Sequence, residues 1–401
     1  MAAPDMAVEH LGAEYFQDPD SVHARLREQR PVTPVIMPDE TPAWLVTGYA
    51  EARAALADPR LRKNMPGRRQ EPDSIYAALE VHMLNSDPPD HERLRRLVNK
   101  AFTARRVERL RPRITAITTR LLDDMSTLGG QAEVDLLASF AFPLPITVIC
   151  ELLGVPVADR DDFRTWSATA VSDTAPPELS RAHAAALIRY FMDLLAVKRR
   201  EPADDLLSAL TAARDDGDGL SENELVSMAF LLLVAGHQTT VNLIGSGVLA
   251  LLLNPAELAR LRADPALIGG AVEELLRHVN PVNNATFRRA AEAVEIGGVR
   301  IGRGDVVLIA LSAANRDPSR FGDPDRLDLG RDSSGHLAFG HGIHHCLGAP
   351  LARLEAQIAL AGLLERFGSM RLAVPANSLR WRPSTLIHGL ESLPVRLVPA
   401  G

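Results

Sequence analysis

Cysteine is nearly absent from this chain of 401 residues, which contains only Cys150 and Cys346. Two cysteines cannot build a disulfide framework, and their scarcity is typical of proteins that work in a reducing cytoplasm. Cys150 lies in the apolar segment 146–153, and we expect it to be a buried core residue. Cys346 is therefore the candidate for a functional cysteine.

Aromatic residues are also scarce, at 4% of the chain, and the net charge of -7 leaves no basic excess. An acidic chain lacks the electrostatic footprint of a nucleic-acid-binding protein, so we expect no nucleic-acid partner. No uninterrupted apolar run reaches the length of a membrane span, and the first residues lack the pattern of a signal peptide. We therefore expect a cytoplasmic protein without a membrane partner.

Helical periodicity is abundant in a chain that is 46% hydrophobic and 24% charged. The longest helical pattern covers residues 221–253 and begins with a capping box, in which Ser221 and Glu224 satisfy each other's backbone N–H groups. At about 1.5 Å per residue, this helix would be on the order of 50 Å long. Short strands are expected near 43–47, 371–374 and 394–398, and a hairpin is expected over 294–310, around Gly297-Gly298 and 302–304.

The most informative stretch is 339–350, Phe-Gly-His-Gly-Ile-His-His-Cys-Leu-Gly-Ala-Pro. Apolar residues recur at the helical period after Cys346, and Pro350 suits a first helical turn. Cys346 thus precedes a helix N-terminus, where free N–H groups and the macrodipole favour a thiolate. Gly340 and Gly348 leave room for a large flat ligand near the backbone. A thiolate beneath a flat ligand indicates haem, with sulfur as the axial ligand of the iron.

Two other interpretations of this stretch remain open from the residues alone. A lone cysteine is most often a small buried hydrophobe. The neighbouring histidines His341, His344 and His345 would also suit zinc, although the chain has no C-x-x-C pair of the kind that structural zinc sites use.

The same stretch resembles the signature Phe-x-x-Gly-x-His-x-Cys-x-Gly of the cytochrome P450 family, which is matched by Phe339, Gly342, His344, Cys346 and Gly348. The resemblance covers nearly the whole chain, with its motifs in the family's order.

The resemblance implies a mainly α cytochrome P450 fold with a small β-rich lobe, in a single domain over 1–401. Haem b would lie between the long helix at 221–253 and the cysteine loop and helix at 339–367. Cys346 would be the metal ligand and supply the axial thiolate.

Other positions match the family's cofactor-binding side chains. His91 and Arg95 lie four residues apart on a helix expected at 91–102 and match a propionate-binding pair, and Arg288 matches the second propionate arginine. The cofactor-binding residues implied by the resemblance are His91, Arg95, Ala235, Gly236, Arg288, Phe339, Gly340, His344, Cys346 and Gly348.

The middle of the long helix, Ala-Gly-His-Gln-Thr at 235–239, resembles the family's oxygen-binding groove, Ala-Gly-x-(Asp/Glu)-Thr. The resemblance implies catalytic roles for Thr239, which would bond to O2 or a nearby water, and for Gln238. Gln238 departs from the family, because an amide does not titrate where the family has an acid. Proton delivery would then use a water chain, a substrate hydroxyl or another side chain. From the residues alone, a buried helix with incidental polar residues is the alternative.

The family also carries a structural Glu-x-x-Arg motif, matched here by Glu274 and Arg277, with Arg326 as the expected third member of the triad. Substrate-lining segments are expected at 62–90 and 165–186. The predicted substrate contacts are Val282, Asn283, Asn284 and Leu386. A solvated loop is the alternative interpretation of these four residues.

The activity implied is monooxygenation of a C–H or C=C bond in a bulky hydrophobic natural product, such as a macrolide, another polyketide or a steroid, with O2 as the oxidant. No flavin or nicotinamide fingerprint is present, so NAD(P)H electrons would arrive through ferredoxin reductase and ferredoxin. Eight arginines within 93–113 offer a dock for an acidic partner of a monomeric enzyme. The alternatives are a peroxide-driven or non-hydroxylating haem-thiolate oxidase and a non-enzymatic haem-containing ligand-binding protein.

Overall fold

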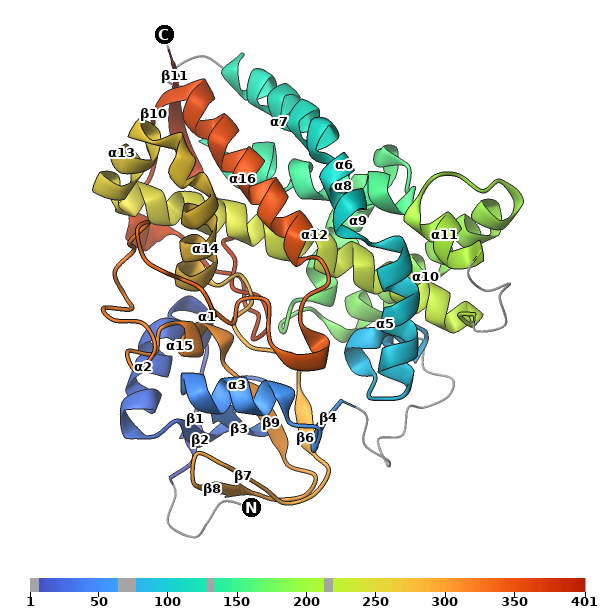
Figure 1. Cartoon of the computed structure of the whole chain (residues 1–401), viewed down its shortest axis with the longest axis vertical. Coiled ribbons are helices and arrows are strands. Elements are labelled where there is room, and N and C mark those ends of the chain that lie inside the picture. The colour runs from blue at the N-terminus through green and yellow to red at the C-terminus, as the bar shows by residue number, and fades with distance from the viewer. Residues whose placement is uncertain (1–6, 64–76, 128–132, 213–218, 401) are drawn as a thin grey trace.

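The structure is a computed structural model that describes residues 7–63, 77–127, 133–212 and 219–400. Helices form most of it, and a small sheet-containing lobe lies at one end (Figure 1). The predicted mainly α fold with a β-rich lobe is therefore confirmed.

The helices of the amino-terminal half are α1 (Glu14–Gln17), α2 (Pro19–Gln29), α3 (Tyr49–Ala57), α4 (Ala77–Glu80), α5 (Asp90–Ala101), α6 (Ala104–Arg109), α7 (Arg111–Ser126), α8 (Pro143–Leu153), α9 (Arg160–Ala170) and α10 (Pro177–Arg200). The later helices are α11 (Leu206–Ala212), α12 (Glu222–Leu253), α13 (Pro255–Ala263), α14 (Ile268–Val279), α15 (Leu311–Asn315) and α16 (Ala349–Arg366), with a short 3-10 turn η6 at Gly342–His344.

The strands are β1 (Glu9–His10), β2 (Val32–Ile36), β3 (Pro42–Val46), β4 (Leu61–Arg62), β5 (Glu133–Asp135), β6 (Arg288–Ala290), β7 (Val294–Ile296), β8 (Val299–Ile301), β9 (Val306–Ile309), β10 (Phe367–Leu372) and β11 (Pro394–Pro399). Six of them form the main sheet in the order β1-β2-β3-β9-β6-β4. A second sheet has the order β10-β11-β5, and β7 pairs with β8 alone.

The main sheet is covered on both faces because its strands alternate between two apolar clusters. On β3, Trp44 and Val46 belong to one cluster and Leu45 to the other. On the parallel neighbour β9, Val307 and Val306 divide in the same way. This period of two follows from the pleat of a strand.

Helix α12 is the axis of the helical part and crosses the middle of the molecule (Figure 1). The predicted capping box is confirmed, since Ser221 and Glu224 each bond the other's backbone N–H. By length and composition α12 is apolar enough to span a membrane, but 67% of its most apolar window is buried. It packs against α8, α14 and α16 and is therefore a core helix.

One strand prediction needs correction. The extended region 294–310 does not form one hairpin, because β7 and β8 pair with each other while β9 leaves to join the main sheet between β3 and β6. Gly297 and Gly298 make the β7–β8 turn with φ angles of 55° and 74°, which a non-glycine residue rarely adopts. Cys150 is fully buried on α8, as expected.

Candidate active site

The cysteine loop is held in place by its own backbone and by α3. The Cys346 N–H donates to the Phe339 carbonyl at 2.9 Å, and the His345 N–H donates to Gly342 at 3.1 Å. Gly342 has φ 75°, and a Cβ there would lie 2.9 Å from the Leu56 carbonyl of α3. Only glycine fits this position, so the signature glycine lets the loop pack closely on the neighbouring helix.

Cys346 lies just before α16, as predicted, and Pro350 occupies the first turn of that helix. Much of the Cys346 surface is accessible, yet the many protein atoms around its sulfur desolvate it and raise the pKa of its thiol. Hydrogen bonds from the backbone of Gly348 and Ala349 oppose this effect. Burial thus opposes the thiolate form, which the helix N-terminus favours and which a bound metal ion would favour further.

A cradle of nitrogen-bearing side chains lies beside the loop. The rings of His91, on α5, and His344 are 4.5 Å apart between centroids. Arg95 donates to the His345 carbonyl at 2.6 Å and so connects α5 to the cysteine loop. Burial, followed by Lys63 and Arg288, lowers the pKa of His344 to about 2, which places these two cations near it.

Arg288 approaches the same cradle from β6. Its side chain is buried and donates to the Leu61 carbonyl at 3.4 Å, and its Nε has no partner within the described ranges of the chain. Burial lowers the pKa of Arg288 to about 10. The structure therefore brings together His91, Arg95, Arg288 and His344, all predicted to bind propionates.

The fit to haem can be tested on buried polar atoms that lack partners. Among the described residues, neither ring nitrogen of His91 has a partner although His91 is only 2% exposed, and Arg288 Nε has none either. Leaving such atoms without partners costs about 1–3 kcal/mol each. Anionic propionates would satisfy them beside a cysteine sulfur, so the residues present fit haem.

Sequence reasoning missed Lys63, at the end of β4, whose charge acts on His344. It precedes residues 64–76, and the sequence gives no signal that separates it from a solvated lysine. Residues 64–76, which belong to the expected pocket segment 62–90, lie outside the described residues.

Thr239 and Ala235 share one face of α12, since the Thr239 hydroxyl donates to the Ala235 carbonyl at 2.9 Å. Both have accessible surface in the otherwise buried middle of the helix. Gly236 faces elsewhere: a Cβ there would lie 2.7 Å from Ile149 Cδ1 on α8. This glycine permits close helix packing, and its orientation does not support the predicted cofactor contact.

Gln238 is buried and bonded away from the Thr239 face. Its Nε2 donates to Ser167 Oγ of α9 at 3.0 Å, and its Oε1 accepts from Arg382 at 3.4 Å. Ser167 also lies 3.1 Å from His237 Nε2. The position that resembles the family's acid thus holds together three segments of this chain.

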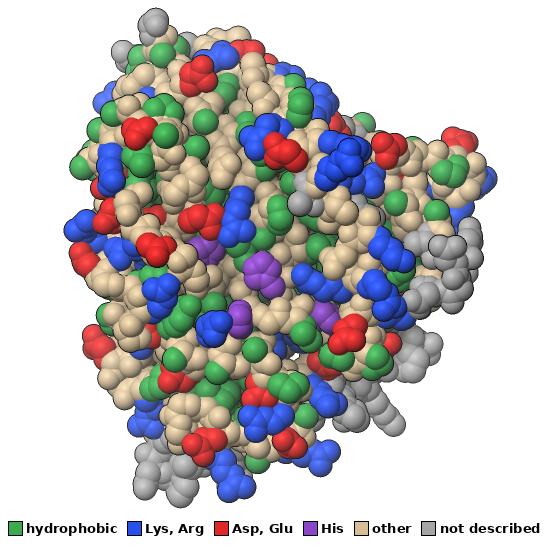
Figure 2. Space-filling model, viewed as in Figure 1, with side chains coloured by type: hydrophobic (Ala, Val, Ile, Leu, Met, Phe, Trp, Pro, Cys, Tyr) green, Lys and Arg blue, Asp and Glu red, His purple; other side chains and the backbone are tan. Residues whose placement is uncertain are grey.

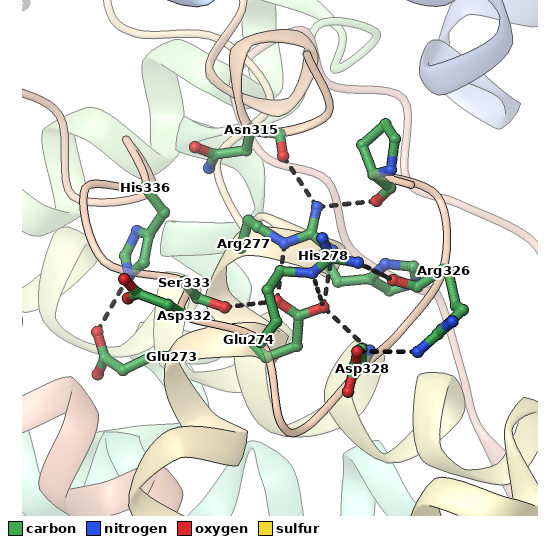
Figure 3. A network of polar contacts seen from close by, with 12 residues as sticks. Glu273, Glu274, Arg277, His278, Asn315, Arg326, Asp328, Asp332, Ser333 and His336 are labelled. Atoms are coloured by element: carbon green, nitrogen blue, oxygen red, sulfur yellow. Dashed lines mark hydrogen bonds and ion pairs between the residues drawn. The ribbon is translucent and has the colours of Figure 1, made fainter. Parts of the chain in front are cut away.

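The Glu274–Arg277 pair is fully buried on α14 (Figure 3). Arg277 Nε and Nη2 donate to the Glu274 carboxylate at 2.7 and 2.8 Å, and Nη1 donates to the carbonyls of Asn315 and Pro324. Although burial opposes it, bonding to Arg277 and Ser333 lowers the pKa of Glu274. The pair therefore anchors the chain that leads into the cysteine loop.

The predicted third member of this triad was wrong. The Arg326 side chain is 62% exposed and pairs with Asp328, and only its backbone carbonyl contacts Arg277. Arg331 instead donates to Glu274 at 3.2 Å and is 12% exposed. Both arginines lie in the same turn-rich segment, and only the path of the chain decides which one turns inward.

The predicted substrate residues lie together, because Val282 bridges to Ile387 and the Asn283 N–H donates to the Leu386 carbonyl at 2.8 Å. Asn283 and Asn284 are nearly fully buried, and both donate to the Tyr15 hydroxyl. Their amide N–H groups thus serve an internal network, whereas Asn284 Oδ1 has no partner among the described residues. Val282 and Leu386 are half-buried.

Comparison with known proteins agrees with this geometry. The model of the cytochrome P450 family matches residues 171–372, about half of the chain. The chain is 55% identical to cytochrome P450 107B1 of Saccharopolyspora erythraea, over 95% of this chain and 96% of that protein. It is 46% identical to 6-deoxyerythronolide B hydroxylase of the same organism, over 98% of both.

Among solved structures, the tirandamycin C-bound P450 monooxygenase TamI superposes with a TM-score of 0.91 and 52% identity, covering 97% of this chain and 100% of that one. Fold, site and sequence agree over almost the full length. The chain therefore belongs to the cytochrome P450 family, among its bacterial monooxygenases.

Proposed function

We propose that this enzyme is a haem-thiolate monooxygenase that inserts one oxygen atom of O2 into a C–H or C=C bond of a bulky hydrophobic natural product. Haem b would be held by Cys346 through its iron and by His91, Arg95, Arg288 and His344 through its propionates. The unpartnered ring nitrogens of buried His91, beside the cysteine loop, carry this proposal.

Bound haem supplies the iron at which O2 is reduced and activated, with the sulfur ligand donating electron density. The residues of this chain prepare that site. The Gly348 and Ala349 N–H groups bond to Cys346 and stabilise negative charge on its sulfur. Thr239 presents a hydroxyl on the accessible face of α12, where it can hold a proton-carrying water. Gln238 holds α9 and residue 382 against α12 and is not a proton source.

The electron donors we propose are ferredoxin and its reductase, docking on the basic face of α5 and α6. Lys and Arg side chains gather over these helices in Figure 2. Pockets on this face are lined by six cations, Arg95, Arg96, Lys100, Arg105, Arg106 and Arg109, and by three carboxylates, Glu92, Glu151 and Asp204. Exposed Ile343 lies at the edge of the first pocket and offers an apolar contact inside a basic rim. An acidic ferredoxin complements this surface.

For the substrate we propose a macrolide or related polyketide, contacted by Val282 and Leu386. The names of the two similar proteins, 6-deoxyerythronolide B hydroxylase and tirandamycin C-bound TamI, support a large oxygenated product over a small aromatic one. We further propose that the enzyme works as a cytoplasmic monomer of one domain.

The experiment is a spectral titration of the ferric protein with macrolactones and steroids, followed by turnover with ferredoxin, its reductase and NADPH. We expect macrolactones to displace the iron-bound water and to give a product that contains one oxygen atom from labelled O2. Product formed only with added hydrogen peroxide would instead support the peroxide-driven oxidase.

A further inference from the structure

The Lys63 ammonium group lies in a site made of backbone and side-chain oxygens. It donates to the Thr286 carbonyl at 2.7 Å, to the Phe287 carbonyl at 3.0 Å and to the Thr286 hydroxyl. An ammonium group has three N–H donors, and these three acceptors use all of them. The side chain therefore holds the two residues that directly precede Arg288.

The backbone of Lys63 binds the other half of the cradle. Its N–H donates to both carboxylate oxygens of Asp87, at 3.0 and 3.1 Å. The Asp87 carbonyl in turn accepts from the His91 N–H at 3.0 Å. Lys63 thus connects the strand that carries Arg288 to the first turn of α5, which carries His91.

The charge of Lys63 also acts on the cradle residues His344 and Arg288. Burial, and then the charge of Arg288, lower the pKa of Lys63 well below its ordinary value, while Asp87 opposes them. Half-buried Lys63 and buried Arg288 repel each other, and the Asp87 carboxylate at the Lys63 backbone offsets only part of this repulsion. A dianionic ligand beside Arg288 would relieve this repulsion.

We propose that Lys63 is a positioning residue for haem: it fixes Arg288 relative to His91 and keeps a positive charge beside the propionates. The inference rests on the proposed haem function, and it concerns a side chain that no sequence motif marks.

The test compares Lys63→Met with two controls. Arg62→Met removes an equal charge one residue away, where the side chain is exposed. Lys63→Arg keeps the charge and the donors. The readouts are the rate at which ferric protein loses haem to excess apomyoglobin and the ferric/ferrous midpoint potential of the retained haem.

We expect Lys63→Met to lose haem about tenfold faster, the effect of losing one charge-assisted contact. Its potential should become more negative, because removal of a nearby positive charge favours the ferric state. Lys63→Arg should stay within about threefold of wild type, and Arg62→Met should match wild type in both readouts. A merely structural role would not move the potential.

Lys63→Met with wild-type haem loss and potential would overturn the inference while leaving haem binding by the wild type intact. A wild-type protein that binds no haem would instead overturn the proposed function. If Lys63→Met does not fold, Thr286→Val removes one acceptor of the ammonium group and should increase haem loss by about threefold. An unchanged rate in that variant would also contradict the inference.

Discussion

Gln238 on α12 and Ser167 on α9 are joined by a hydrogen bond of 3.0 Å from the Gln238 amide to the Ser167 hydroxyl. The direction of this bond follows from its neighbour. His237 Nδ1 lies 2.7 Å from the Leu233 carbonyl, which can only accept, so Nε2 of this neutral ring is an acceptor. Ser167 has one proton, which it can give to His237 Nε2 at 3.1 Å or to the Arg164 carbonyl at 3.3 Å. In both cases its oxygen accepts from position 238, where an amide supplies a donor and a carboxylate does not.

Gln238→Glu should therefore lower the free energy of unfolding by about 1 kcal/mol, because one buried acceptor loses its donor. The same substitution should cost much less in a Ser167→Ala background, where the conflict is absent. Chemical denaturation of the four proteins of this cycle measures the difference. An equal cost in both backgrounds would show that the hydroxyl does not select the amide. The same Gln238→Glu variant also tests catalysis. If it forms no more product per electron than wild type, the absence of an acid at position 238 does not limit the reaction.

Thr239→Ala should divert electrons from product to hydrogen peroxide and raise the peroxide-to-product ratio on the order of tenfold. The adjacent Thr240→Ala is the matched control, because Thr240 is buried and faces away from the accessible side of α12. The measurement is peroxide and product formed per NADPH consumed. If both variants show the wild-type ratio, Thr239 takes no part in proton delivery.

Arg331→Ala and Arg326→Ala distinguish the true third member of the Glu274 network from the one expected from sequence. Arg331 is 12% exposed and bonds to buried Glu274, so its loss should cost about 2–3 kcal/mol. Arg326 is 62% exposed, and its ion pairs should contribute less than about 0.5 kcal/mol. Thermal unfolding of the two variants compares them directly. A larger loss in the Arg326 variant would contradict the position of Arg331 beside Glu274.

Glu355 on α16 predicts a pH dependence of stability. It is fully buried, neither of its carboxylate oxygens has a partner in the part of the chain that the structure describes, and burial raises its pKa well above the ordinary value. Above the ordinary pKa of about 4.3 the unfolded chain releases this proton while the folded chain keeps it, so this residue makes stability fall as pH rises.

Glu355→Gln removes this dependence and keeps the shape of the side chain. We expect its melting temperature to exceed that of wild type at pH 8 and to differ less at pH 5. An equal difference at both pH values would mean that Glu355 has a charged partner or an ordinary pKa.

The sequence predicted the motifs of the site well because each depends on local geometry. A cysteine before a helix N-terminus and a His-x-x-x-Arg pair on one helical face are set by a few neighbouring residues, and both have the expected placement. The strands and helices with strong patterns were found for the same reason.

Contacts between segments that are distant in the sequence could not be predicted from local patterns. Lys63 acquires its role from residues more than two hundred positions away, and the choice between Arg326 and Arg331 depends on the path of a turn-rich segment. The sequence suggested that Asn283 and Asn284 line the pocket. In the structure their amide N–H groups donate to the hydroxyl of Tyr15, which lies in an amino-terminal helix.

The most direct test of this account is the absorption spectrum of the reduced protein with carbon monoxide, compared among wild type, Cys346→Ser and Cys150→Ser. Cys150 is the other cysteine and is buried in α8, so it is the matched control. The account predicts a thiolate-type carbonyl band in wild type and Cys150→Ser and its loss in Cys346→Ser. An unchanged band in Cys346→Ser, or no band in wild type, would contradict haem ligation by Cys346.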